Sequence, residues 1–312
     1  MEIALSTCWN SHRHTDGRAM LEEIREAGFQ VVELSHGVRV SLAPGVLDAV
    51  AEGIVRVGSV HNFCPLPPGV LGASPNLYEP TAWFRSEQKA WVRQTRRTID
   101  FAAQVSAKVV VLHGGRIRTV WGNPEKAMRR ARWISLDRGK PLQDRVHAKQ
   151  VFRQLRRMER FSGIARVRLL ACLRAILPYA ESKEIQLALE NREGVLEYPL
   201  DSHFAGIFDE LGAPDTLGYW HDTGHAQRKA LLGITQPRKL LLQNQKRLLG
   251  MHLHDVSLDE RDHLIPGRGI VDWDLVRTHL EPHHHTVLEL SPAVTTDDLR
   301  AGHEYLRQRL HP

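Results

Sequence analysis

Eight short runs of apolar and β-branched residues recur along the chain of 312 residues, and stretches with helical spacing separate them. A run such as VVVL at 109–112 is apolar on both faces, as expected of a strand that helices cover on both sides. Apolar residues three or four positions apart predict helices at 19–28, 91–106, 204–212 and 297–310. Eight strands that alternate with helices favour a closed parallel barrel. We therefore predict an α/β fold, a (β/α)8 TIM barrel, with strands at 3–7, 30–35, 56–62, 108–113, 185–190, 217–222, 249–254 and 286–290.

The fourth and fifth runs lie about 70 residues apart, against about 30 elsewhere. Between Arg116 and Leu169 the chain carries 16 Lys and Arg but 4 Asp and Glu, a local net charge of +12 on a remainder of −6. This stretch has the pattern of a long helix, with Gly163 as a candidate break and Pro178 near its end. We predict one domain over 1–312 with a basic helical insertion at about 116–180. The insertion could attract a phosphorylated substrate or nucleic acid, or its arginine stems could simply cover apolar surface.

Targeting and redox features indicate a cytoplasmic protein with no membrane partner. The first residues, MEIALSTCWN, lack the basic and apolar regions of a secretory signal, and no run of about 18 apolar residues occurs. Three cysteines, Cys8, Cys64 and Cys172, are widely spaced and odd in number, which argues against a disulfide framework.

Side chains that bind metals fall at the C-terminal ends of six consecutive predicted strands, where the strands of a barrel share one mouth. A carboxylate in an apolar run such as LALE or VLEL is costly to bury unless it is paired or binds a metal. Mixed carboxylate and imidazole ligands suit Mn, Zn, Co, Fe or Mg. The sequence therefore predicts one to three divalent ions, bound by members of the set His61, His113, Glu190, Asp222, His225, His252, His263 and Glu289.

The sequence allows several assignments of these ligands to individual metal ions. One ion could bind Glu190, Asp222, His252 and Glu289, and a second could bind His61 and His113 with Glu190 shared. His225 and His263 could hold a third ion or contact the substrate, and Glu33 or His36 could reach inward from the second strand. The predicted substrate contacts are His225, His254, Asn191, Arg192, Arg268 and Trp9, the last in a loop with His12 and His14.

The fragments LALEN (187–191), HDTGHAQ (221–227), GMHLHDV (250–256), DHLIPGRGIVDW (262–273) and VLEL (287–290) resemble the xylose isomerase-like TIM barrel superfamily. That superfamily includes sugar isomerases and epimerases as well as apurinic endonucleases of the endonuclease IV type. Resemblance to the isomerase and epimerase branch implies one metal bound by Glu190, Asp222, His252 and Glu289. It also implies that Glu190 and Glu289 act as acid and base on opposite sides of a substrate carbon. His225 would contact the hydroxyl groups of the substrate.

Resemblance to the endonuclease branch implies three zinc ions and nine ligands, and eight of those ligand types are present here. The ninth should be an Asp two residues before His263, where this chain has Arg261 followed by Asp262. The leading hypothesis is therefore a divalent-metal-dependent isomerase or epimerase of a sugar, a sugar-like polyol or a keto compound, and such a protein could form a homo-oligomer. The alternatives are a phosphodiester hydrolase acting on abasic DNA and a non-enzymatic barrel that binds metal or another ligand.

Overall fold

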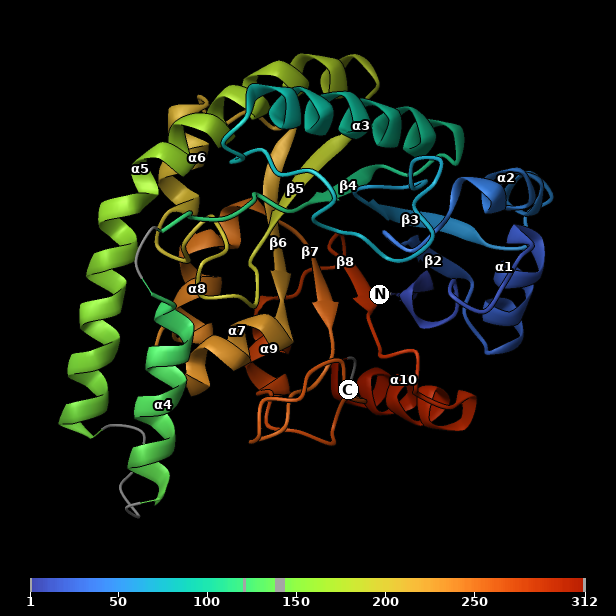
Figure 1. The fold of residues 1–312 in the computed structure, drawn as a ribbon. Helices are drawn as coiled ribbons and strands as arrows, with labels where there is room; N and C mark the ends of the chain where they lie inside the picture. The colour runs from blue at the N-terminus through green and yellow to red at the C-terminus, as the bar shows by residue number, and fades with distance from the viewer. Residues whose placement is uncertain (1, 120–121, 138–143, 311–312) are drawn as a thin grey trace.

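Eight parallel strands, hydrogen-bonded in sequence order, close into a barrel in which β8 pairs with β1 (Figure 1). The computed structural model describes residues 2–119, 122–137 and 144–310. The predicted fold class is confirmed, and each strand end lies within two residues of its predicted position. The strands are β1 (Ile3–Ser6), β2 (Val31–Leu34), β3 (Arg56–His61), β4 (Val109–Leu112), β5 (Gln186–Glu190), β6 (Leu217–Asp222), β7 (Leu248–Leu253) and β8 (His285–Leu288).

Ten α-helices in the described part of the chain surround the barrel (Figure 1). Several begin at an aspartate whose carboxylate accepts a backbone N–H of the first turn, as Asp16, Asp222 and Asp272 do. The helices are α1 (Gly17–Glu26), α2 (Ala43–Ala51), α3 (Arg85–Gln104), α4 (Pro124–Asp137), α5 (Arg145–Ser182), α6 (Phe204–Glu210), α7 (Thr223–Leu231), α8 (Pro237–Asn244), α9 (Trp273–His279) and α10 (Thr296–Leu310). None of them combines the length and apolarity needed to cross a membrane.

The barrel interior changes from apolar to polar along the direction of the strands. Side chains two positions apart on a strand share a face, and the last residue of the apolar layer on each contributing strand is followed by an inward polar one. Ala188 is thus followed by Glu190, and Val287 by Glu289. The apolar layer is closed by Trp220, for which Gly250 leaves room, since a Cβ there would lie 2.5 Å from the indole. The buried apolar layer consists of Ala4, Val31, Val109, Val111, Ala188, Trp220 and Val287.

The segment predicted as a basic insertion contains α4 and most of α5. Helix α5 runs unbroken for 38 residues, so the candidate break at Gly163 is wrong, and Pro178 lies inside the helix near its end. Leu169, Leu173 and Ile176 are fully buried. The last third of α5 therefore packs on the barrel, whereas its beginning forms an arm with α4 (Figure 1).

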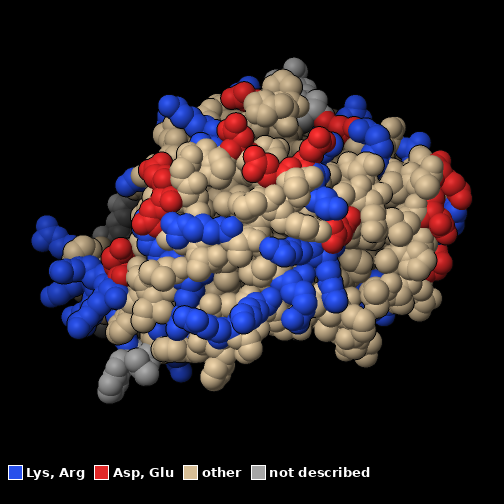
Figure 2. Space-filling model, turned by 90° about the horizontal axis from the view of Figure 1, so that it is seen from above, with Lys and Arg blue, Asp and Glu red and all other residues tan. Residues whose placement is uncertain are grey.

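The arm is fastened to the loop after β7. The nearly buried Arg132 of α4 donates to the carbonyl of Leu258 at 2.7 Å and pairs with Glu260, which also pairs with Arg129. Removal of Glu260 would leave the buried charge of Arg132 uncompensated. The arm thus stands beside the end of the barrel from which the β7 loop emerges. Figure 2, which looks onto the molecule from above, shows Lys and Arg gathered in bands and Asp and Glu in separate groups.

Candidate metal and substrate site

The floor of the site is a buried pair between Glu33 on β2 and His252 on β7. Both carboxylate oxygens of Glu33 lie 3.1 Å from His252 Nε2. Ser6 and Ser59 also donate hydrogen bonds to Glu33, at 3.1 and 2.8 Å. Burial alone would raise the pKa of Glu33, but His252 and the hydroxyl donors hold it below its ordinary value. Nε2 therefore carries the proton that Glu33 accepts, and Nδ1 faces the other way.

Three buried carboxylates surround His252 Nδ1. The distances to it are 3.2 Å from Glu289 Oε2, 3.6 Å from Glu190 Oε1 and 3.7 Å from Asp222 Oδ2. Nδ1 nevertheless has no hydrogen-bond partner among the described residues. The four side chains, which come from the ends of β5, β6, β7 and β8, thus converge on one point.

The electrostatics around His252 Nδ1 favour a bound positive charge. Burial lowers the pKa of His252, yet Glu289 and Glu33 raise it well above its ordinary value. Burial raises the pKa of Asp222, yet the neighbouring His225 and His254 bring it far below its usual range. Three carboxylates in one buried site are costly to ionise unless a proton or a metal ion compensates their charge. Three carboxylate oxygens and one imidazole nitrogen fit a divalent transition metal or Mg²⁺.

A second group of ligand atoms meets at the other oxygen of Glu190. His61 Nε2 and His113 Nε2 lie 3.3 and 3.0 Å from Glu190 Oε2. The Nδ1 atoms face the carbonyl oxygen of Asn62 at 2.9 Å and the amide oxygen of Asn76 at 3.0 Å. Both acceptors require an Nδ1–H, and an imidazole that carries its proton on Nδ1 points its Nε2 lone pair at the carboxylate oxygen. Lone pairs that face one another are best satisfied by a shared cation.

Protonation of His113 does not resolve the contact between its Nε2 lone pair and the carboxylate of Glu190. Burial and the nearby Arg192 lower the pKa of His113 to about 3, so the imidazole is neutral at ordinary pH. The donor set of His61, His113 and Glu190 therefore fits a second metal ion.

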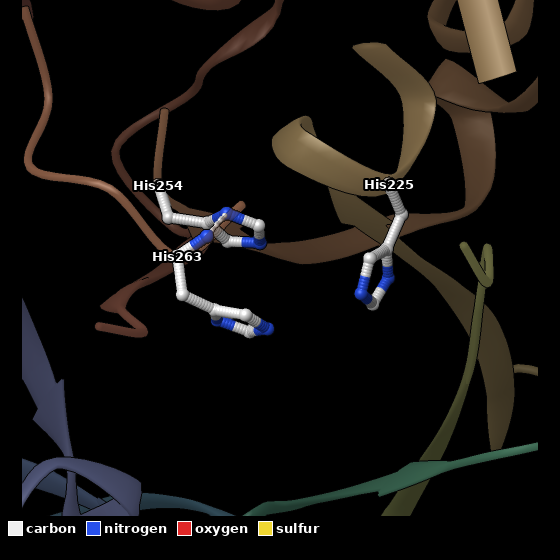
Figure 3. Close-up of side chains that lie close together, drawn as sticks. All are labelled: His225, His254 and His263. Atoms are coloured by element: carbon white, nitrogen blue, oxygen red, sulfur yellow. Dashed lines mark hydrogen bonds between the residues drawn. The ribbon is translucent and has the colours of Figure 1, made fainter. Parts of the chain in front are cut away.

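His225, His254 and His263 form a third group at the mouth, where ligand atoms from all three lie within 4.8 Å of one another. The rings of His254 and His263 stack 4.2 Å apart, and His225 faces them across a gap (Figure 3). His254 Nδ1 accepts the backbone N–H of His263 at 2.9 Å, so its Nε2–H donates to Asp222 at 3.0 Å. Both nitrogens of His254 are thus engaged, and it supports Asp222 rather than offering a free nitrogen to a ligand.

Asp262 also approaches His225, in a group that includes Glu193. Arg228 Nη1 lies 2.6 Å from Asp262 Oδ2 and pairs with Glu193 as well. A guanidinium therefore already pairs with both of the carboxylates that could join His225. Arg261, at the position of the missing ninth ligand, is 73% exposed and pairs with Asp259.

Residues 21–309 match the family described as xylose isomerase-like TIM barrel. The chain belongs to this family. A curated relative, the uncharacterized protein y4fM of Sinorhizobium fredii (strain NBRC 101917 / NGR234), is 25% identical over 306 residues, which cover 88% of this chain and 83% of the relative.

Solved structures share the fold of this xylose isomerase-like protein over nearly its whole length. A D-tagatose 3-epimerase-like protein has a TM-score of 0.69 and 19% identity, and covers 99% of this chain and 97% of its own. An L-ribulose 3-epimerase has a TM-score of 0.68 and 14% identity, with 99% and 95% covered. A 3-keto-D-glucoside 4-epimerase from E. coli has a TM-score of 0.66 and 13% identity, with 99% of each chain covered. At these identities the likeness shows the fold.

Three predicted substrate contacts of this xylose isomerase-like barrel are bonded to other protein groups. The Asn191 amide accepts the backbone N–H of Asp222 at 2.8 Å and the Tyr219 hydroxyl at 2.9 Å, and so braces β5 against β6. Trp9 is 1% exposed and donates to a carbonyl at 2.8 Å. Arg268 is exposed and pairs with Asp298 of α10 at 2.5 Å. These side chains are bound to other parts of the protein, which the linear sequence does not reveal.

Arg192, by contrast, lies inside the site. It is 9% exposed, and its Nη1 is 3.1 Å from Glu190 Oε1 while its Nε is 3.3 Å from Glu197 Oε1. Burial raises the pKa of Glu190, but Arg192 and the surrounding histidines lower it well below its ordinary value. Arg192 thus keeps Glu190 ionised, in addition to any contact with a substrate.

A pocket of about 380 Å³ opens beside Glu289 and His263. Its walls come from the loops after β1, β2, β3, β7 and β8. The sequence patterns named His12 and His36 among its residues but gave no signal for Arg39, which follows the second strand without any recognisable motif. The lining residues are Cys8, Ser11, His12, Ser35, His36, Gly37, Arg39, Leu71, Gly72, Ala73, Asp262, His263, Glu289, Leu290, Ser291 and Pro292.

Proposed function

We propose that this protein is a divalent-metal-dependent isomerase or epimerase that acts on a sugar or a sugar-like polyol or keto compound. The observation that carries the proposal is the convergence of Glu190, Asp222 and Glu289 on His252 Nδ1, beside a pocket of suitable size. Likeness to epimerases that act on D-tagatose-type, L-ribulose and 3-keto-D-glucoside substrates supports the same reaction class.

Each group has a role in the proposed reaction. The metal, held by Glu190, Asp222, His252 and Glu289, would polarise a substrate carbonyl and make the adjacent C–H more acidic. Glu190 and Glu289, which approach from β5 and β8, would remove and return the proton. Glu190 is suited to act as a base because Arg192 keeps it ionised. His225 and His263 stand at the mouth, where they would contact substrate hydroxyls.

Solvent proton exchange tests this assignment. Metal-loaded protein incubated with ketohexoses in D2O should incorporate deuterium at the carbon that changes configuration. Glu190→Gln and Glu289→Gln should each abolish incorporation, whereas Glu304→Gln on the exposed face of α10 should not change it. If either site variant still exchanges at the normal rate, the acid and base assignment is wrong.

A phosphodiester hydrolase is the second candidate, and the cluster of His61, His113 and Glu190 favours it. A single-metal epimerase has no need of two further histidines at Glu190 Oε2. The basic side chains on α5 would suit a polyanionic substrate. Purified protein loaded with Zn, Mn or Co should then cleave duplex DNA containing an abasic site. Absence of cleavage with all three metals would remove this candidate.

A further inference from the structure

The pocket beside Glu289 contains two buried nitrogen atoms that have no hydrogen-bond partner among the described residues. They are His36 Nδ1 and Arg39 Nε. Both side chains come from the loop after β2, and both line the same wall of the pocket. The Nε–H of Arg39 is a donor, and a buried donor without an acceptor is costly. Both residues line the pocket, and Arg39 Nη1 also has no hydrogen-bond partner among the described residues, so a ligand in the pocket can supply acceptor oxygens to the Arg39 guanidinium.

The positive charge of Arg39 is also not compensated by any carboxylate of the described residues. Its Nη2 donates to the backbone carbonyl of His14, and within residues 2–119, 122–137 and 144–310 no carboxylate lies within ion-pair distance. Its neighbours in the pocket differ, because Asp262 is paired with Arg228 and Glu289 belongs to the carboxylate group around His252. A guanidinium with most of its N–H donors free is well matched to a carboxylate or a phosphate.

The remaining lining fits the body of a sugar. Leu71, Leu290 and Pro292 provide apolar surface, and Ser11 provides a hydroxyl. A ligand that fills this pocket reaches from Glu289, at the metal position, to Arg39. The exposed His12 lies on the same rim, and its ring N–H can donate a hydrogen bond to an anion.

We infer that the substrate is an anionic sugar, a sugar acid or a sugar phosphate, whose charged group binds to Arg39. His36 and His12 complete the anion subsite, and the reacting carbons lie at the metal. This inference rests on the proposed isomerase or epimerase function, and it specifies the class of substrate for that site.

Calorimetric titration of the Mn-loaded protein tests the subsite directly. D-Fructose, D-fructuronate and D-fructose 6-phosphate are the probes, so that the two anionic sugars separate a carboxylate subsite from a phosphate subsite. One of the anionic sugars should bind roughly tenfold or more tightly than the neutral sugar. Equal affinity for all three would overturn the inference.

Variants then locate the anion. Arg39→Met should reduce the preference for the anionic sugar to roughly threefold or less, and Arg39→Lys should restore part of it. Arg93→Met, which removes one exposed charge from α3, should leave the preference unchanged. Because Arg39→Met could disturb folding, His12→Glu at the exposed rim provides a second test, and repulsion there should also weaken anion binding. A preference that survives both changes would show that the anion does not bind here.

Deuterium exchange with the same sugars separates this inference from the proposed function. Exchange into neutral sugars without any preference for anionic ones would support the function and overturn the subsite. Selective binding of an anionic sugar that depends on Arg39, but without exchange on any substrate, would support the subsite and contradict the epimerase function.

Discussion

Glu33 on β2 accepts the Nε2–H of His252 on β7 with both carboxylate oxygens at 3.1 Å, although 219 positions separate the two residues. This contact fixes the tautomer of His252 and directs Nδ1 at Glu190, Asp222 and Glu289. A carboxylate behind a metal-binding histidine orients the ring and makes it a more basic ligand.

Glu33→Gln should therefore weaken divalent metal binding by roughly 10- to 100-fold while the barrel stays folded. The amide can still accept a hydrogen bond, but it carries no negative charge. Competition with a metal chelator would measure the affinity, and circular dichroism would report the fold. Glu26→Gln, at an exposed position of α1, is the matched control. Unchanged affinity in Glu33→Gln would mean that His252 does not bind the metal.

Asp222 has a second role as the N-cap of α7, since its Oδ1 accepts the backbone N–H of His225 at 2.6 Å. Asn caps helices about as well as Asp, whereas Ala does not. Asp222→Asn and Asp222→Ala should both lose metal binding. In metal-free protein, the Ala variant should be about 1 kcal/mol less stable than the Asn variant in urea unfolding. Equal stability of the two would show that the cap contributes nothing.

His221 should make the free energy of unfolding depend on pH. Burial lowers its pKa to about 3, against 6.5 for an exposed histidine, so the unfolded chain binds this proton more readily. Stability from this residue is fully present above pH 6.5 and is lost as the pH falls towards 3. The loss should approach roughly 1.4 kcal/mol per pH unit, and His221→Phe should remove it.

Urea unfolding of metal-free protein between pH 7 and 4 would measure that difference. Chelator is needed because protons also compete for metal ligands. An identical pH slope in wild type and His221→Phe would contradict the neutral state of His221. Tyr219 keeps its hydrogen bond to Asn191 in the variant, so the comparison isolates the imidazole.

Two glycines should respond in opposite ways to alanine. At Gly250 a Cβ would lie 2.5 Å from Trp220 and 2.6 Å from a backbone carbonyl, so Gly250→Ala should destabilise the barrel by about 1–3 kcal/mol. At Gly163, within α5, nothing lies within 4 Å, so Gly163→Ala should stabilise the protein by about 0.5–1 kcal/mol. Thermal unfolding of both variants would check the signs, and a stable Gly250→Ala would show that the interior layer around Trp220 can relax.

The positions of the strands and of their terminal ligands could be predicted because both follow from local pattern. Apolar runs separated by helical spacing define parallel strands, and a barrel brings their C-terminal ends together. The two-residue alternation of a strand then places Glu190, Asp222, His252 and Glu289 inside. The predicted break at Gly163 does not occur, because a single glycine weakens a helix only slightly. The burial of apolar side chains elsewhere in α5 outweighs that loss.

The amino-acid sequence by itself determined the barrel and the set of side chains that line its mouth, since these depend on residue type and period along one strand. Only the tertiary structure decided which imidazole nitrogens stay free, that Asn191, Trp9 and Arg268 are bound elsewhere, and that Arg39 lines the pocket without an acidic partner. Those outcomes depend on hydrogen bonds and ion pairs between loops and strands far apart in the chain, and no local pattern encodes such partners.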